Sequence, residues 1–304
     1  MNRALHAIPL AALSLALMAA SGWAHAQDTD TDKDDDRLTT SGKLLLTGGV
    51  SQIEGSAGGG LTPWAVIGGY GTRDEIGANA FYTQVNLDDY RLQSYGALVG
   101  FYDRVELSLS RQKFDTQAVG GALGLGDGFT FTQDTIGVKV KVAGDAVLEQ
   151  DSWLPQIAVG AQYKRNDQAA VLAFVGAKDD SGVDYYVSAT KLYLSQSLLL
   201  NGTVRFTKAN QFGILGFGGD RNDSYRAQFE GSAAYLLTRN LAVGAEYRTK
   251  PDNLGIAGED DAYDVFVAWA PYKNVSLTVA YVDLGNIVIR DDQRGVYASL
   301  QVGF

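Results

Sequence analysis

Residues 296–304 read VYASLQVGF, an alternating series that ends on the last residue of the chain. The apolar members occupy every second position, and they are Val296, Ala298, Leu300, Val302 and Phe304. Successive side chains of a β-strand point to opposite faces of a sheet, so this spacing predicts a strand with one apolar face. That face could lie against a soluble core or against lipid, and the period alone does not separate the two.

The same period of two continues through most of the chain after Lys43. Residues 275–281 (VSLTVAY), 241–247 (LAVGAEY) and 136–142 (IGVKVKV) are examples in which every second residue is apolar. Glycine is abundant, with 36 residues, proline is scarce, with 5, and there are 16 tyrosines. This composition favours many strands and turns over helices.

The lengths of the predicted connections favour a membrane barrel over a soluble sandwich. Short connections are expected at residues 102–104, 195–197, 238–240 and 271–274. Long connections rich in glycine and aspartate are expected at residues 112–133, 165–184, 207–224, 249–261 and 285–295. Short periplasmic turns that alternate with long outside loops are typical of outer-membrane barrels.

We therefore predict an all-β protein, a closed antiparallel transmembrane barrel of about fourteen strands. The first two strands are expected near residues 44–50 and 64–70, and twelve strands would remain if these two pair poorly. An even number places both ends of the barrel on the periplasmic side.

The N-terminus has the features of a secretory signal peptide. Arg3 provides a positive charge, residues 8–20 form an apolar stretch, and Ala24, Ala26 and Gln27 mark a small-x-small cleavage site. The alternative is an inner-membrane anchor, for which the apolar stretch is short.

Three segments follow from this interpretation. Residues 1–26 are predicted to be a cleaved signal peptide, 27–42 an acidic periplasmic lead, and 43–304 the barrel. The lead contains DTDTDKDDD at residues 28–36, which indicates a solvated spacer. Its aspartate spacing lacks the glycine and the distal glutamate of a calcium loop.

Cleavage at this site would also remove both histidines, His6 and His25, and the chain has no cysteine. Of the 25 basic residues only Arg3 would be lost, so 24 would remain against 35 acidic residues, a formal charge of −11. A nucleic-acid partner is therefore not expected. The mature chain cannot build Ser-His, Cys-His or thiolate-metal sites, so no enzyme activity and no cofactor is predicted. A catalytic pair of carboxylates, Glu230 with Glu246, is the one formal alternative.

Residues 43–83, KLLLTGGVSQIEGSAGGGLTPWAVIGGYGTRDEIGANAFYT, resemble the start of a proteobacterial family catalogued as domain of unknown function 3034. The resemblance implies one outer-membrane barrel and brings no substrate, cofactor or catalytic residue. The series that ends at Phe304 resembles the terminal signature of outer-membrane proteins, which implies recognition by the barrel-assembly machinery. Outer-membrane lipid and lipopolysaccharide are the other expected partners.

If the apolar positions face lipid, a set of charged residues faces the lumen. The candidates for lining the lumen and setting its selectivity are Lys139, Lys164, Lys191, Arg205, Glu230 and Glu246. A basic flank beside an acidic one would orient polar solutes and tune ion selectivity. Alternatively, these residues pair across adjacent strands and close the lumen with salt bridges.

The function that this pattern favours is a passive channel for small solutes. One alternative is a transporter of hydrophobic or aromatic compounds that uses the apolar residues 169–177 (AAVLAFVGA), which could instead be a strand extended beyond the membrane. Another alternative is a plugged structural barrel without transport. The substrate and the oligomeric state are not given by the sequence.

Overall fold

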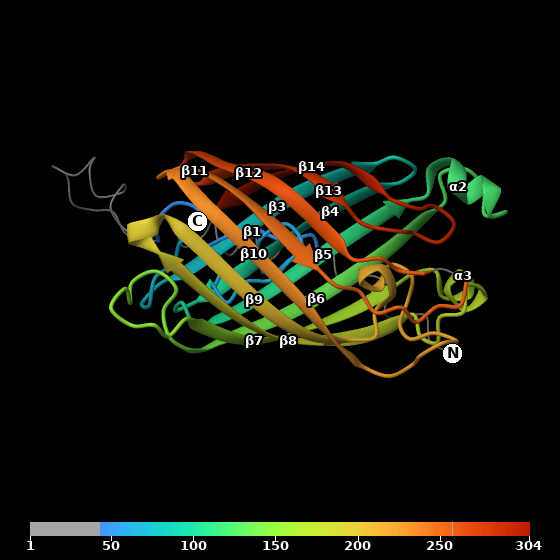
Figure 1. Cartoon of the computed structure of the whole chain (residues 1–304), viewed down its shortest axis with the longest axis horizontal. Coiled ribbons are helices and arrows are strands. Elements are labelled where there is room, and N and C mark those ends of the chain that lie inside the picture. Colours follow the sequence, from blue (N-terminus) through green and yellow to red (C-terminus); the bar gives the residue numbers. More distant parts are fainter. Residues whose placement is uncertain (1–42, 257) are drawn as a thin grey trace, which may run out of the picture. The chain divides into compact units, whose positions relative to one another are not determined.

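Twelve antiparallel strands close into a barrel in the computed structural model, which describes residues 43–256 and 258–304 (Figure 1). Each strand pairs with its neighbours in sequence, and the barrel closes where the last strand pairs with the first. The strands are β3 (Ile76–Leu87), β4 (Arg91–Phe101), β5 (Val105–Asp115), β6 (Thr130–Ala143), β7 (Gln156–Asn166), β8 (Ser181–Tyr193), β9 (Leu198–Thr207), β10 (Arg226–Thr238), β11 (Leu241–Arg248), β12 (Ala262–Tyr272), β13 (Val275–Asp283) and β14 (Arg294–Gly303). The predicted signal peptide, its cleavage site at Ala24, Ala26 and Gln27, and the acidic lead lie outside the described residues.

The strand alternation sorts side chains between the two faces of the wall. On β6 the exposed Ile136 and Val138 alternate with buried Thr135 and Lys139. On β14 the whole predicted series from Val296 to Phe304 lies on the outer face, while Tyr297 and Ser299 point inward. The prediction of a barrel with an apolar outer face is confirmed.

The predicted count of fourteen strands includes two that are not part of the wall. They were expected near residues 44–50 and 64–70, where the structure has no strand of the wall. The short strands β1 (Val50–Ser51) and β2 (Ala57–Gly58) occur in this part of the chain instead, and they pair with each other. Residues 50–69 are rich in glycine and other small residues and are all buried, so this part of the chain lies inside the barrel and not in its wall.

The connections define two different mouths. The inner mouth has the C-terminus and the short turns at residues 102–104, 194–197, 239–240 and 273–274, with one longer connection at 144–155. The outer mouth has the long loops at 116–129, 167–180, 208–225, 249–261 and 284–293, with one short turn at 88–90. The predicted alternation of short periplasmic and long outside connections is thus present, and the inner mouth is the periplasmic one. No helix among the described residues is long and apolar enough to cross a membrane.

Exposed aromatic side chains form a row near each mouth. The row near the outer mouth consists of Tyr163, Tyr185, Tyr225, Tyr247, Tyr263 and Tyr281. The row near the inner mouth consists of Tyr102, Trp153, Tyr193, Tyr235, Trp269, Tyr272 and Phe304. Amphipathic rings favour the headgroup regions of a bilayer, so the two rows bound the membrane-spanning band. The protein is an integral outer-membrane barrel.

Three short helices lie in the outer loops: α2 (Gln117–Ala122), α3 (Ala169–Phe174) and η3 (Asn210–Gly213). Figure 1 shows α2 and α3 at the end opposite the C-terminus. Residues 169–177 therefore do not extend a strand, because the stretch begins with α3, which buries only Leu172 and leaves Phe174 83% exposed.

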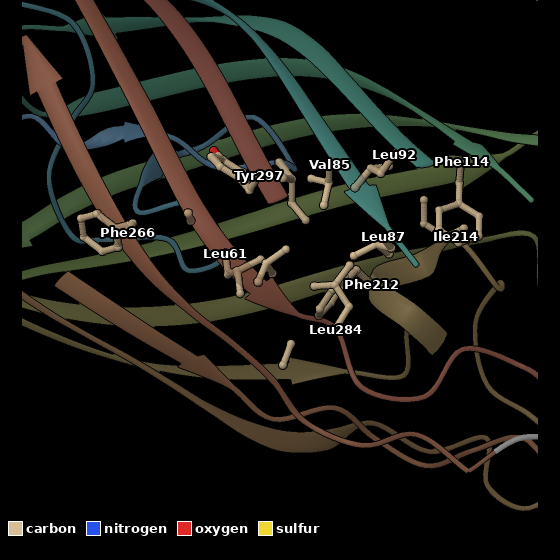
Figure 2. Close-up of a cluster of buried hydrophobic side chains, with 14 of the residues drawn as sticks. Leu61, Val85, Leu87, Leu92, Phe114, Phe212, Ile214, Phe266, Leu284 and Tyr297 are labelled. Carbon is tan, nitrogen blue, oxygen red and sulfur yellow. The ribbon is translucent and has the colours of Figure 1, made fainter. Parts of the chain in front are cut away.

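Apolar side chains from these loops gather inside the outer end of the barrel. Figure 2 shows Phe212 and Leu284 from two loops close to Leu87 at the end of β3, with Phe114 and Ile214 nearby. The same cluster of buried residues continues to Leu61 and Tyr297, deeper in the barrel. The outer loops therefore fold inward at this mouth.

Candidate functional site in the barrel lumen

A stretch of chain fills the barrel from the inner mouth. We call residues 50–69 the luminal segment, and every one of these twenty consecutive residues is buried. The segment enters and leaves at the same mouth, because the Lys43 backbone nitrogen donates to the Tyr70 carbonyl at 3.2 Å and the Tyr70 nitrogen donates to the Phe304 carbonyl at 3.0 Å. The segment is thus a loop inserted from the periplasmic side.

Small residues let this loop turn tightly and approach the wall. The pairing of β1 with β2 is closed by a turn in which Gly55 has a φ of 98°, a conformation that glycine adopts without strain. Gly59 lies so close to β11 that a Cβ atom there would overlap the Glu246 carboxylate. The glycine-rich sequence is therefore explained by the tight turn and by the close approach of the segment to the wall.

Six buried charged side chains meet at the tip of the luminal segment. We call them the Glu54 cluster, and each side chain is at most 3% exposed. The members are Glu54, Lys164, Asp184, Arg205, Glu230 and Arg248. Only Glu54 comes from the luminal segment, since the other five belong to β7, β8, β9, β10 and β11 of the wall.

The Glu54 carboxylate is bound through both oxygens. Arg248 donates to Oε2 at 2.9 Å and to Oε1 at 3.2 Å, a two-pronged contact. The Lys164 ammonium also binds Oε1, and the Arg205 guanidinium lies 3.6 Å from Oε2. Within the segment itself, the Gln52 amide donates to Oε2 at 3.0 Å.

The wall residues of the cluster also bind one another. The Asp184 carboxylate lies 2.6 Å from the Lys164 ammonium and 3.4 Å from Arg205. Glu230 accepts from Arg205, and its Oε1 lies 3.4 Å from the Arg248 Nε. Three cations thus face three carboxylates, and the cluster is formally neutral only while Glu54 is in place.

A second contact region lies on β5 and β6. Glu106 accepts from the backbone nitrogens of Ala57 at 3.0 Å and Gly68 at 2.8 Å, while Lys139 donates to the carbonyls of Trp64 at 3.1 Å and Val66 at 2.7 Å. This pair therefore holds mainly the backbone of the luminal segment, and Glu106 also accepts from the Ser56 hydroxyl at 2.9 Å.

A third contact region lies on β11. Glu246 accepts from the Leu61 nitrogen at 2.7 Å and from the hydroxyls of Thr62 at 2.6 Å and Ser232 at 2.7 Å. Asp264 is its register partner on β12 and is also buried. Both carboxylates face Gly60 of the luminal segment.

Lys191 lies apart from these regions, near the inner mouth. Its ammonium donates to the carbonyls of Glu149 and Leu154 in the connection at residues 144–155, the latter at 3.3 Å. A cavity of about 620 Å³ opens at this mouth, lined by charged residues that include Arg73, Arg104 and Lys141.

The Glu54 cluster is covered from the outer side by η3. The Phe212 ring lies 4.2 Å from the Arg248 guanidinium, and its carbonyl accepts from Lys164 at 3.1 Å. Gln211 and Phe212 adopt left-handed backbone conformations, with φ of 42° and 61°. Non-glycine residues pay for such conformations in conformational energy, so the surrounding contacts must hold η3 in place.

All six predicted lumen residues are inside the barrel. Lys164, Arg205 and Glu230 meet in the Glu54 cluster, whereas Lys139, Glu246 and Lys191 contact other parts of the chain. Asp184 adds a negative charge to the flank that was expected to be basic. Arg248 adds a positive charge to the flank that was expected to be acidic. Glu54, Glu106, Asp184 and Arg248 were missed as site residues, although Glu54 is the only charged residue between positions 44 and 72.

Three solved outer-membrane proteins are similar to this chain. The KdgM porin in complex with disordered oligogalacturonate has 12% identity and a TM-score of 0.48, covering 74% of this chain and 99% of its own. Outer membrane protein Omp33 of Acinetobacter baumannii has 8% identity and a TM-score of 0.45, covering 77% and 100%. Outer membrane phospholipase A of Escherichia coli has 12% identity and a TM-score of 0.40, covering 74% and 92%. At these levels the likeness carries no argument about function.

No curated protein matches the sequence. One family model matches residues 47–301, which include the luminal segment from Val50 onward and nearly all of the wall. The chain therefore belongs to the family described as "Protein of unknown function (DUF3034)".

Proposed function

We propose that this protein is a conduit for small polar solutes across the outer membrane and that the luminal segment is its gate. The observation that carries the proposal is the insertion of residues 50–69 into a charged wall from one mouth only.

The inner face of the wall carries buried charges where it contacts the luminal segment. Replacement of buried ion pairs by apolar residues is often neutral or stabilising, so a wall that only packed a permanent insert would need no ion pairs. Here Lys164, Arg205 and Arg248 are all buried against the insert. A polar interior is typical of barrels that conduct through water.

The path of the luminal segment is the second argument. Both of its ends lie at the inner mouth, near Tyr70 and Phe304, so the loop can leave toward the periplasm without breaking any pairing of the wall. The contacts that must break include those of the segment with the Glu54 cluster, Glu106 and Glu246, and those of wall side chains with the carbonyls of Ile53, Pro63 and Ala65.

A reversible lock tests the proposal. The hydroxyl oxygens of Thr62 on the segment and Ser232 on β10 lie 2.5 Å apart, and the chain has no cysteine of its own. The double variant Thr62→Cys with Ser232→Cys should form a disulfide that ties the segment to the wall. In planar bilayers, refolded wild-type protein should show voltage-dependent openings, the oxidised double variant none, and the reduced variant openings again.

Each single cysteine variant is the matched control and should conduct under oxidising conditions. Equal currents from the locked and the reduced double variant would show that the segment is not a gate. Silence of the wild type and of the reduced variant at all voltages would overturn the conduit and favour a permanently plugged structural barrel. Complete burial of the segment is the observation that supports this second candidate.

The six predicted lumen residues then have a proposed role in selectivity. Lys191 is the best one to test, because it lies near the inner mouth and outside the Glu54 cluster. The change Lys191→Glu should shift the reversal potential of open channels toward cations. An unchanged reversal potential would place Lys191 outside the ion path.

We infer no catalytic role for the buried carboxylates. Glu230 is bound by two guanidinium groups and Glu246 by two hydroxyls and a backbone nitrogen. A hydrophobic-compound transporter is less well supported, because α3 directs only Leu172 inward. The outward series from Val296 to Phe304 remains our proposed signal for the assembly machinery, and lipopolysaccharide our proposed outer-leaflet partner.

A further inference from the structure

We infer that the Glu54 cluster is a binding site for the carboxylate of a solute and that Glu54 occupies this site in the closed barrel. The inference rests on the proposed function, because a solute reaches the site only after the luminal segment has moved.

The cationic groups that hold Glu54 all belong to the wall. Its three cationic partners, Lys164, Arg205 and Arg248, come from the separate wall strands β7, β9 and β11. The wall is continuous without the segment, so these three groups remain together when Glu54 leaves. The two-pronged contact of Arg248 fits the planar geometry of any carboxylate.

Departure of Glu54 would change the net charge of the cluster. Three wall cations would then face only Asp184 and Glu230, so the vacated site carries one uncompensated positive charge. A buried unpaired charge is strongly unfavourable, and an entering anion removes this cost.

The carboxylates that border the vacated site limit the charge of the anion that can bind there. Asp184 lies 2.6 Å from Lys164, and Glu230 is bound to Arg205, so negative charge already borders the site. A second negative charge on the ligand would be repelled by both. The site therefore favours a monocarboxylate over a dianion such as sulfate.

Chemical rescue in the full-length chain tests this inference. The variant Glu54→Ala should refold with a lowered thermal unfolding midpoint, because its three wall cations then face only two carboxylates. Acetate should raise the midpoint in a saturable manner and recover about half or more of the loss, since it binds the folded state. Chloride or sulfate at equal ionic strength should recover much less, and the wild type should not respond to acetate beyond its response to chloride.

Glu246→Ala is the matched control. It also removes a buried carboxylate that contacts the luminal segment, but among the described residues Glu246 has no cation as a hydrogen-bond partner. Acetate should rescue this variant no better than chloride. Equal rescue of both variants, or no specific rescue of Glu54→Ala, would overturn the inference.

If Glu54→Ala does not refold in chloride, the yield of folded barrel with acetate becomes the readout, and failure to refold in acetate also counts against the site. This experiment measures binding and not current. Acetate rescue in a barrel that never conducts would keep the site and remove the conduit. Conduction without acetate rescue would keep the conduit and remove the site.

Discussion

The Lys139 ammonium lies 3.1 Å from the Glu106 carboxylate, and both side chains are only 1% exposed. The two residues face each other across β5 and β6, and each also binds the backbone of the luminal segment. The pair therefore couples the wall to the segment mainly through the backbone of the segment, with one further contact from the Ser56 hydroxyl to Glu106.

Removal of one partner should be costly. Lys139→Met leaves Glu106 buried without its cation, and loss of one member of a buried pair typically costs about 3–5 kcal/mol. Urea unfolding in lipid vesicles should show a decrease in stability of this order. The control is Lys113→Met on β5, where the lysine is exposed and little change is expected. Equal stability of the two variants would contradict the assignment.

Phe212 should be the residue that keeps η3 folded over the Glu54 cluster. Phe212→Ala removes a buried ring that contacts Arg248, and such truncations typically cost about 3–5 kcal/mol. Phe174→Ala removes an exposed ring from α3 and should cost almost nothing. Thermal unfolding midpoints compare the two variants, and a Phe212→Ala midpoint no lower than that of Phe174→Ala would show that the ring does not hold this loop.

Glu259, in the outer loop at residues 249–261, should make stability depend on pH. Burial raises the pKa of Glu259 from an ordinary value of 4.5 to about 7, and the Lys250 ammonium, 3.8 Å away, opposes this rise. The folded protein then binds this proton more tightly than the unfolded chain does. The contribution of Glu259 to the free energy of unfolding is therefore largest below pH 4.5 and is lost as the pH rises to about 7.

The Glu259→Gln variant isolates this contribution. Its unfolding midpoint should fall less between pH 5 and pH 8 than that of the wild type. Asp291→Asn, which changes an exposed acid in another outer loop, should keep the wild-type dependence. Identical pH profiles for the wild type and Glu259→Gln would show that Glu259 is charged throughout.

The position of the apolar outer face in the bilayer can be tested by arginine substitutions at two depths. Val279 lies midway along β13 and is 54% exposed, whereas Leu237 lies beside the turn at residues 239–240. Val279→Arg should cost about 2–4 kcal/mol in lipid, and Leu237→Arg about 0–1 kcal/mol. Unfolding in vesicles measures both, and a reversed order would mean that the membrane crosses the barrel at another level.

Much of the wall could be predicted from the sequence because it depends on local regularities. The alternation in Val296–Phe304 gives the two faces of β14, and the same alternation places Lys164 and Glu230 inside. The luminal segment misleads such a prediction, because short runs of small and apolar residues near Val50 and Val66 have the composition of strands. The single charge at Glu54 was the available signal that this stretch is different.

The contacts within the site could not be predicted in the same way. Glu54 meets Lys164 across 110 residues and Arg248 across 194. Alternation fixes the face on which each side chain lies, but it does not fix the height at which a separate loop stops in the lumen. The long connection predicted at residues 165–184 included Asp184. In the structure β8 begins at Ser181, so Asp184 belongs to the wall.

The insertion of the loop from the inner mouth also orders the events of folding. Ser51 donates its backbone N–H to the Gln301 side chain, 250 residues away, and Thr62 meets Ser232 across 170. Contacts this distant form late, after the entropy of closing the chain has been overcome. We therefore expect the luminal segment, near the start of the described chain, to be among the last parts to reach its final position, and to do so from the periplasm.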